Sequence, residues 1–158
     1  MTKFNAEDGT YQKELVVEVT LGDLIPDEHH ETLCKWWDIY YNGKIPRDFV
    51  PKHGSVAYFK GKLAAACFLF INDTKLCHLD FCMVDPEIGA GRRVYLLRKV
   101  VEAGLAKARE IVGEDVTVWS LTDHAVVGRV YQEQGFELLG EGDCYAYTKD
   151  EKKREFLT

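Results

Sequence analysis

Short runs of β-branched and aromatic residues alternate along the chain with longer stretches in which apolar residues recur every three or four positions. The short runs predict strands and the longer stretches predict helices, because the two elements place side chains on one face with periods of 2 and 3.6 residues. Strands are expected at residues 14–20, 55–59, 63–71, 75–84, 116–121, 136–139 and 144–148. Helices are expected from Asp27 onward, at 92–112 and at 125–134.

The strands at 55–59 and 63–71 form the clearest pair. They are separated by Lys60-Gly61-Lys62, a short polar segment with a glycine that is typical of a tight hairpin turn. The strand at 63–71 shows no alternation of apolar and polar residues, so both of its faces should be buried. We therefore place it in the centre of a sheet.

The first helix should be bounded by polar and turn-forming residues. Gly22 is expected to end the first strand, and Asp27 is a suitable N-cap. The apolar face of this helix comprises Leu33, Trp36, Trp37 and Tyr40, which we expect in the core. Residues 42–51 contain two prolines and a glycine and predict an irregular loop, which could cover a site or simply connect two elements.

One stretch, residues 76–111, combines three features of a phosphate site. An apolar strand runs into Asp85-Pro86, then into a loop with Gly89 and Gly91, then into a long helix that Gly113 closes. A helix N-terminus offers free backbone N–H groups and a favourable dipole for an anion, and glycine allows close approach. Arg92 and Arg93 add cationic donors there.

The order of elements predicts an α/β fold, with one mixed, mostly antiparallel sheet flanked by helices. With 158 residues the chain is read as one domain, 1–158, with a polar lead-in at 1–13 and a solvated, charged tail at 149–158. Thr122-Asp123 offers a cap for the helix at 125–134.

Composition and charge narrow the class of protein. The net charge of −6 makes a nucleic-acid partner unlikely, since sequence-independent binding needs a basic surface. No apolar run reaches the length of a membrane span, and the N-terminus lacks the apolar core of a signal peptide, so we expect no membrane partner. Five cysteines, an odd number without a CxxC motif, suggest reduced, buried thiols in a cytoplasmic protein.

Two motifs resemble those of the GNAT superfamily of N-acetyltransferases. That family has a strand ending in V-x-P, followed by Q/R-x-x-G-x-G/A at the start of a helix. Here the strand ends in MVDP, at 83–86, and the loop reads IGAGRR, at 88–93. The family also has a helix tyrosine four residues before a Gly-Phe pair, which Tyr131 and Gly135-Phe136 match. The resemblance covers residues 14–148 and implies a GNAT-like fold.

The chain departs from the family pattern at three positions. Ile88 stands where the family has Gln or Arg, and Arg93 stands where it has a small residue. His124 replaces the asparagine that often precedes the helix tyrosine by seven residues. Arg93 could block a coenzyme or replace backbone contacts with its guanidinium.

The resemblance implies acetyl transfer from acetyl-CoA, the co-substrate, to an amine of a small molecule or a protein. It suggests Asp80 as the general base, with His78 as an alternative or orienting partner, and Tyr131 as the general acid. The coenzyme would be held by the end of the strand and the following loop, namely Met83, Val84, Gly89, Ala90, Gly91, Arg92 and Arg93.

Each assignment has a structural alternative. Asp80 could be a buried structural carboxylate, Tyr131 an ordinary helix tyrosine, and the two arginines a solvated helix start. By alternation, His78, Asp80 and Cys82 share one strand face, with Cys77, Leu79, Phe81 and Met83 on the other. We expect no metal there, because a strand splays such ligands apart.

The leading hypothesis is therefore a GNAT-fold N-acetyltransferase, for which a homodimer is one possible assembly. The first alternative is a catalytically degenerate GNAT-fold protein with a structural or assembly role, of the kind that phages encode. The second is a GNAT-fold enzyme with another donor or acceptor. Aromatic residues expected around the acceptor are Trp36, Trp37, Phe49, Tyr145 and Tyr147, which fit many substrates.

Overall fold

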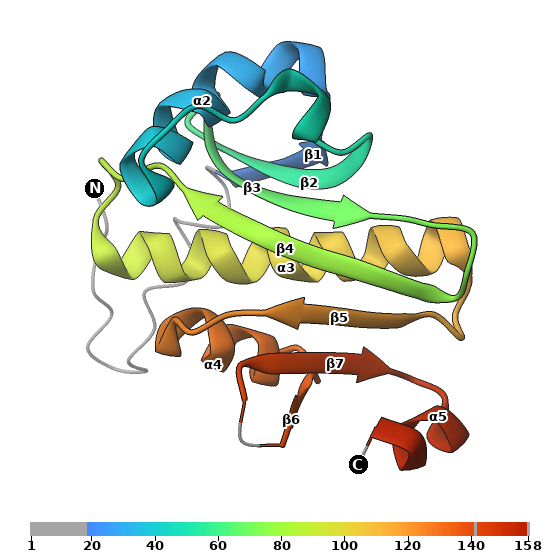
Figure 1. Ribbon diagram of the computed structural model, residues 1–158. Helices are drawn as coiled ribbons and strands as arrows, with labels where there is room; N and C mark the ends of the chain where they lie inside the picture. Colours follow the sequence, from blue (N-terminus) through green and yellow to red (C-terminus); the bar gives the residue numbers. More distant parts are fainter. Residues whose placement is uncertain (1–18, 141, 158) are drawn as a thin grey trace.

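A computed structural model describes residues 19–140 and 142–157 (Figure 1). The strands are β1 (Val19–Asp23), β2 (His53–Phe59), β3 (Lys62–Phe70), β4 (Leu76–Val84), β5 (Thr117–Leu121), β6 (Glu137–Leu139) and β7 (Cys144–Thr148). The helices are α2 (Pro26–Tyr41), the 3-10 turn η1 (Arg47–Phe49), α3 (Ala90–Val112), α4 (Ala125–Glu133) and α5 (Glu151–Leu157).

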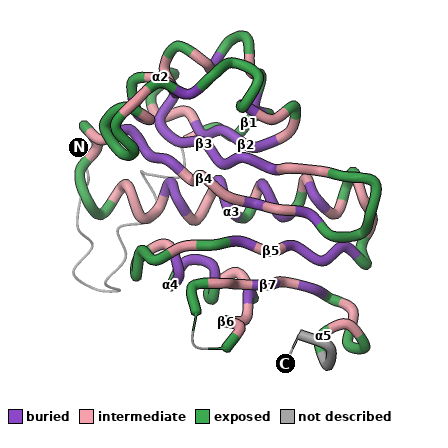
Figure 2. The backbone as a smooth tube through the Cα atoms, viewed as in Figure 1, coloured by how far each residue is buried: buried purple, intermediate pink, exposed green. Residues whose placement is uncertain are grey.

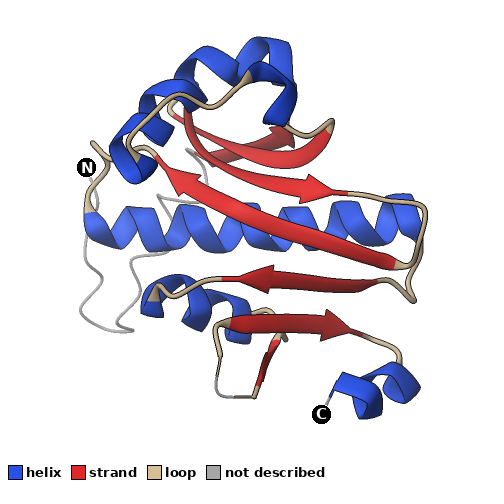
Figure 3. Ribbon diagram, in the orientation of Figure 1, coloured by secondary structure: helices blue, strands red, loops and turns tan. Residues whose placement is uncertain are grey.

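The strands form one seven-stranded sheet in the order β1-β2-β3-β4-β5-β7-β6 (Figure 3). All neighbouring pairs are antiparallel except β4 and β5, which run parallel. The hairpin between β2 and β3 turns at Lys60 and Gly61, both with positive φ, the backbone of a type I′ turn. The predicted mixed, mostly antiparallel sheet is thus confirmed.

The parallel pair β4–β5 is only partly joined. The pairing runs from Leu76 opposite Thr117 to His78 opposite Trp119, and β4 then continues to Val84 without β5 beside it. Figure 1 shows the two strands separating toward the N-terminus of α3. In α/β sheets, ligands bind beyond the carboxyl ends of parallel strands at such a gap.

Two hydrophobic clusters hold helices against opposite faces of the sheet. The cluster on the α3 side includes Leu79, Val100 and Tyr131, all fully buried. The cluster on the α2 side includes Leu33 and Phe68, also fully buried. Figure 2 shows buried positions along α3 and along the central strands. The predicted central position of β3 is confirmed, because seven consecutive residues of this strand are buried.

The first helix begins differently from the prediction. Asp27 is not the N-cap: the cap is Ile25 and Pro26 is the first helical residue, where proline fits well. The Ile25 N–H donates to His29 Nδ1 at 3.0 Å, so a histidine supplies the bond expected from the aspartate. Asp27 instead accepts from the Arg47 guanidinium at 2.6 Å. Of the four residues predicted in the core, Leu33 and Trp36 are buried, Trp37 is half-buried and Tyr40 is exposed.

Other predicted boundaries also shift. Gly22 does not end β1 but pairs with Val56 within it, and the predicted residues 14–18 of that strand lie outside the described part. The N-cap of α4 is His124, whose N–H donates to Thr122 Oγ1. The tail is not merely solvated: it forms α5, at whose start the Asp150 carboxylate accepts from the Lys152 N–H at 3.0 Å. Among the described residues, no helix combines the length and apolarity needed to cross a membrane.

Gly104 lets α3 approach β4 closely, because a Cβ there would lie 2.7 Å from the buried Leu79 Cδ1. We predict that Gly104→Ala lowers the free energy of unfolding. Overpacking costs about 1–3 kcal/mol, which exceeds the gain in helix propensity of about 1 kcal/mol. Gly91→Ala, where a Cβ meets open space, is the control and should be at least as stable as the wild type. Chemical denaturation of both variants checks this, and equal stability would contradict the tight contact.

Candidate active site

A β-bulge lies in the middle of β4. Phe68 pairs with Asp80 and Ala66 pairs with Met83, so Cys67 alone faces Phe81 and Cys82. Phe81 has φ +51, in the left-handed region that bulky side chains rarely adopt. The bulge adds one residue to the strand and therefore inverts the alternation beyond it.

This bulge corrects the predicted faces of β4. Cys82 does not share a face with His78 and Asp80: it packs on the α3-side cluster. Phe81 and Met83 belong to the α2-side cluster instead. The structure therefore separates the acidic group and the thiol that the sequence placed together. The described residues contain no group of three or more His, Cys, Asp or Glu that could hold a metal ion.

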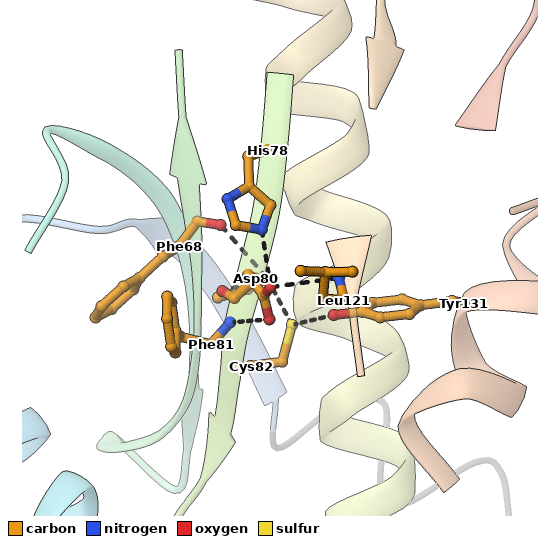
Figure 4. A network of polar contacts seen from close by, with 8 residues as sticks. Phe68, His78, Asp80, Phe81, Cys82, Leu121 and Tyr131 are labelled. Carbon is orange, nitrogen blue, oxygen red and sulfur yellow. Dashed lines mark hydrogen bonds and ion pairs between the residues drawn. The ribbon is translucent and has the colours of Figure 1, made fainter. Parts of the chain in front are cut away.

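Asp80 is held by three hydrogen bonds at the point where β4 and β5 separate (Figure 4). Its Oδ2 lies 2.8 Å from His78 Nε2 and 3.4 Å from the backbone N of Leu121 on β5. Its Oδ1 accepts from the Phe81 N–H at 2.7 Å. The carboxylate thus has a fixed orientation and remains partly exposed, with 16% of its side-chain surface accessible.

His78 is fixed by aromatic stacking as well as by Asp80. Its ring lies parallel to that of Trp119, with centroids 4.0 Å apart, and Phe70 stacks on it at 5.5 Å. Trp119, His78 and Phe70 lie on the neighbouring strands β5, β4 and β3, respectively. Trp119 therefore lies over the joined part of the β4–β5 pair rather than in the part where the strands separate.

Tyr131 of α4 lies on the other side of β4. Its ring is fully buried, and its hydroxyl is 3.6 Å from Cys82 Sγ, which in turn is 2.7 Å from Cys67 Sγ. Burial, and then the electrostatic effect of the neighbouring Cys82 sulfur, raises the pKa of the Tyr131 phenol well above its ordinary value. Burial likewise raises the pKa of the Cys67 thiol. Both groups therefore keep their protons at neutral pH.

Ser120 adds a further buried polar group on the same side. Its hydroxyl lies close to the Tyr131 phenol, but it forms no well-aligned hydrogen bond with any of the described residues. A buried polar group without such a bond is uncommon in folded proteins. This residue carries no sequence motif, so sequence reasoning did not identify it.

The loop between β4 and α3 is organised by Asp85. Its carboxylate accepts from the Glu87 N–H at 3.0 Å, and its carbonyl accepts from the Ile88 N–H at 3.1 Å. Gly89 is the N-cap of α3, without a side-chain capping bond. Backbone N–H groups in the first turn of α3 therefore lack helical partners, as at every helix start.

The glycines of this loop are not explained by backbone geometry or packing. Neither Gly89 nor Gly91 has a positive φ, and a Cβ at either position would meet nothing within 4 Å. Both residues and the intervening Ala90 are exposed, and the first turn of α3 contains no acidic side chain. The loop thus leaves open space for an anion in front of free N–H groups.

The two arginines at the start of α3 point to different neighbours. The Arg92 guanidinium lies over the Phe59 ring, 5.0 Å from its centroid. Arg93 Nη2 donates to the Tyr40 hydroxyl at 3.3 Å, and this hydroxyl donates to the Val84 carbonyl at 2.5 Å. The Arg93 side chain therefore contacts α2. The Tyr40 hydroxyl is bonded to a backbone carbonyl at the end of β4. The sequence did not indicate this role for Tyr40.

The fold is that of the GNAT acetyltransferases, as comparison with solved structures shows. No family model matches the sequence, and no curated protein sequence matches it. The GNAT family N-acetyltransferase YhbS of Escherichia coli, in complex with CoA, superposes with a TM-score of 0.66 at 16% identity, covering 89% of this chain and 87% of its own.

Two further structures agree with this fold. The yncA protein of Salmonella typhimurium, with its cofactor acetyl-CoA, gives a TM-score of 0.62 at 11% identity over 85% of this chain and 95% of its own. An aminoglycoside 6′-acetyltransferase of type Ii gives a TM-score of 0.61 at 11% identity, covering 82% of this chain and 96% of its own. At such identities the likeness concerns the fold alone.

The short distance between Cys67 and Cys82 predicts that mild oxidation joins these two thiols. Diamide should take up two hydrogens and leave one disulfide, which needs the sulfurs about 2.05 Å apart. Peptide mapping by mass spectrometry should find this link. Cys67→Ser should abolish it, whereas Cys77→Ser, which removes a buried thiol elsewhere on β4, should not. A link between other cysteines, or none, would contradict the arrangement.

Proposed function

We propose that this protein is an N-acetyltransferase that moves an acetyl group from acetyl-CoA to an amine. One observation carries the proposal: where β4 loses its pairing with β5, a fixed carboxylate, Asp80, and a buried phenol, Tyr131, lie on opposite faces of β4. Transfer to an amine requires both a base and an acid near the reacting group. The GNAT fold, with neighbours that contain acetyl-CoA or CoA, supports it.

The residues at the gap suit the coenzyme. Its phosphates would meet the free N–H groups at Gly89, Ala90 and Gly91, where open space and the helix dipole favour an anion. Arg92 and Arg93 would add charge-assisted hydrogen bonds. The arm of the coenzyme would follow Met83 and Val84, on the part of β4 that no longer has β5 beside it. Bound there, acetyl-CoA would supply an activated acyl group on a thiol leaving group.

Each side chain then has one task. Asp80 would accept the proton of the ammonium group, because its carboxylate is fixed, partly exposed and acceptor-only. His78 would orient Asp80 through the bond to Oδ2. Tyr131 would protonate the departing thiolate, because burial keeps its phenol protonated.

A second candidate is a non-enzymatic protein on the same fold. The contact of Tyr40 with the Val84 carbonyl favours it, because this bond closes the end of β4 that a coenzyme would use. Ile88 and Arg93, which depart from the family's loop pattern, point the same way. The two candidates differ in whether the loop binds CoA at all.

Titration calorimetry with CoA separates the two candidates. We predict saturable binding that Gly91→Glu weakens at least ~10-fold, because a carboxylate at the helix start repels the phosphates and fills the open space. Ala106→Glu, an exposed position on the same helix, is the matched control and should bind like the wild type. Absence of binding at millimolar CoA would reject the catalytic proposal.

The acid and base assignments predict a loss of turnover without a loss of coenzyme affinity. Asp80→Asn and Tyr131→Phe should each lower kcat by about 10²–10⁴-fold, the usual contribution of a positioned acid or base. Because burial raises the pKa of Tyr131, its donor form should persist through the alkaline range, so this residue should impose no fall in rate below pH 10. Tyr95→Phe, a half-buried tyrosine on α3, is the control. Wild-type kcat in Tyr131→Phe would refute its assignment.

A further inference from the structure

Five aromatic side chains gather on the α2 side of the sheet beside Asp80. We call them the aromatic surface: Trp37, Tyr41, Phe49, Phe70 and Phe81. Phe81 is at the centre, with ring centroids 5.1 Å from Trp37, 5.6 Å from Phe49, 6.0 Å from Tyr41 and 6.3 Å from Phe70. They come from α2, η1, β3 and β4, so the tertiary fold assembles this surface.

The aromatic surface is not part of the fully buried hydrophobic core. Phe49 and Tyr41 are 42% and 49% exposed, and the other three rings are half-buried. Phe68, which is fully buried, already packs under Phe70 and Phe81 and completes the core beneath them. A contiguous group of exposed apolar side chains on a folded protein commonly marks a binding surface.

The backbone of β4 is strained to place Phe81 there. Its φ of +51 is costly for a bulky residue, and such strain concentrates at functional sites. The Asp80 carboxylate accepts from the Phe81 N–H, so one local bond fixes both the ring and the acidic group. The carboxylate and the central ring are therefore positioned together.

The charge beside this surface is negative. Tyr41 lies within the field of Asp80: burial, and then this carboxylate, raises the pKa of its phenol to about 12. Asp123 acts on this phenol in the same direction, and the nearby cation Arg47 is paired with Asp27. A cationic ligand with an apolar body matches this combination, because a cation is attracted both to a carboxylate and to aromatic faces.

We infer that the acceptor is a small arylalkylamine, a primary amine joined by a short chain to an aromatic ring. The ring would pack on the aromatic surface and the ammonium group would lie at Asp80. This inference rests on the proposed acetyl transfer and names its substrate class. A polyamine would need several carboxylates in place of the rings, and a peptide would need backbone donors and acceptors that aromatic side chains do not offer.

The reaction then balances with the groups at the site. The ammonium proton passes to Asp80, the nitrogen lone pair forms the C–N bond to the acetyl carbon, and the C–S bond breaks. The thiolate that leaves takes the proton of Tyr131. As the amide forms, the nitrogen loses a second proton, which passes through solvent to the Tyr131 phenolate, while Asp80 releases its proton to solvent. The products are an N-acetyl arylalkylamine, CoA with its thiol protonated and one proton in solution.

The experiment compares phenethylamine with propylamine, spermidine, kanamycin and a short peptide with an N-terminal phenylalanine, by CoA release. We expect kcat/KM for phenethylamine to exceed that for propylamine by about 10- to 100-fold, the value of burying one ring. Phe49→Ser, at an exposed position of η1, should raise KM for phenethylamine and so reduce the ratio of kcat/KM between phenethylamine and propylamine. Ile39→Ser, also exposed and on α2, is the control that should change neither.

A binding measurement keeps this inference separate from the proposed function. Phenethylamine without acetyl-CoA should change the fluorescence of Trp37 saturably, and Trp37→Phe should remove the change. If CoA does not bind but this titration saturates, the catalytic proposal fails and the aromatic surface stands as an amine site. If CoA binds and spermidine, kanamycin or the peptide is the preferred acceptor, or if the titration shows no change, the arylalkylamine inference is wrong.

Discussion

The left-handed backbone at Phe81 is the constraint on which the site depends. One extra residue in β4 opposite Cys67 inverts the two faces of the strand. Before the bulge, His78 and Asp80 point away from α3, and after it Cys82 points toward α3 and meets Tyr131. A regular strand would have placed Asp80 and Cys82 on the same face. The bulge therefore puts the Asp80 carboxylate and the Cys82 thiol on opposite faces of one strand, and the thiol meets the buried Tyr131 phenol.

The separation of β4 from β5 is the second half of this arrangement. Where two strands of a sheet are no longer paired, their backbone N–H and C=O groups need other hydrogen-bond partners. Here the Asp80 carboxylate accepts from the Leu121 N–H on β5, so it bridges the start of the opening. Trp119 and His78 stack across the last joined pair and stabilise the point of separation. The position of the opening is thus determined by side chains as much as by the strands.

Much of the fold follows from local patterns in the sequence, and the site only in part. The hairpin at Lys60-Gly61, the buried β3 and the long α3 were predicted correctly. The spacing of apolar residues and the presence of turn-forming residues are features of the local sequence. The bulge was not, because LCHLDFCMV reads as an ordinary strand and the extra residue is visible only against the register of β3. The caps at Ile25 and His124 were missed because neither side chain forms the capping hydrogen bond by which a helix start is usually predicted. The roles of Ser120 and Tyr40 depend on contacts between distant elements and have no sequence signal.

Internal hydrogen bonds stabilise the end of β4. Tyr40 satisfies the Val84 carbonyl, and Arg93 in turn donates to the Tyr40 hydroxyl, so α2, β4 and α3 are linked at one point. A coenzyme arm along β4 would exchange these internal bonds for its own rather than add new ones, and each exchange changes the free energy by only about 0.5–1.5 kcal/mol. Affinity must then come mainly from the phosphates at the open loop, where no side chain is displaced. The same contact ties the helix that carries Trp37 and Tyr41 to the loop proposed for the coenzyme, so the two parts of the proposed site share one set of internal hydrogen bonds.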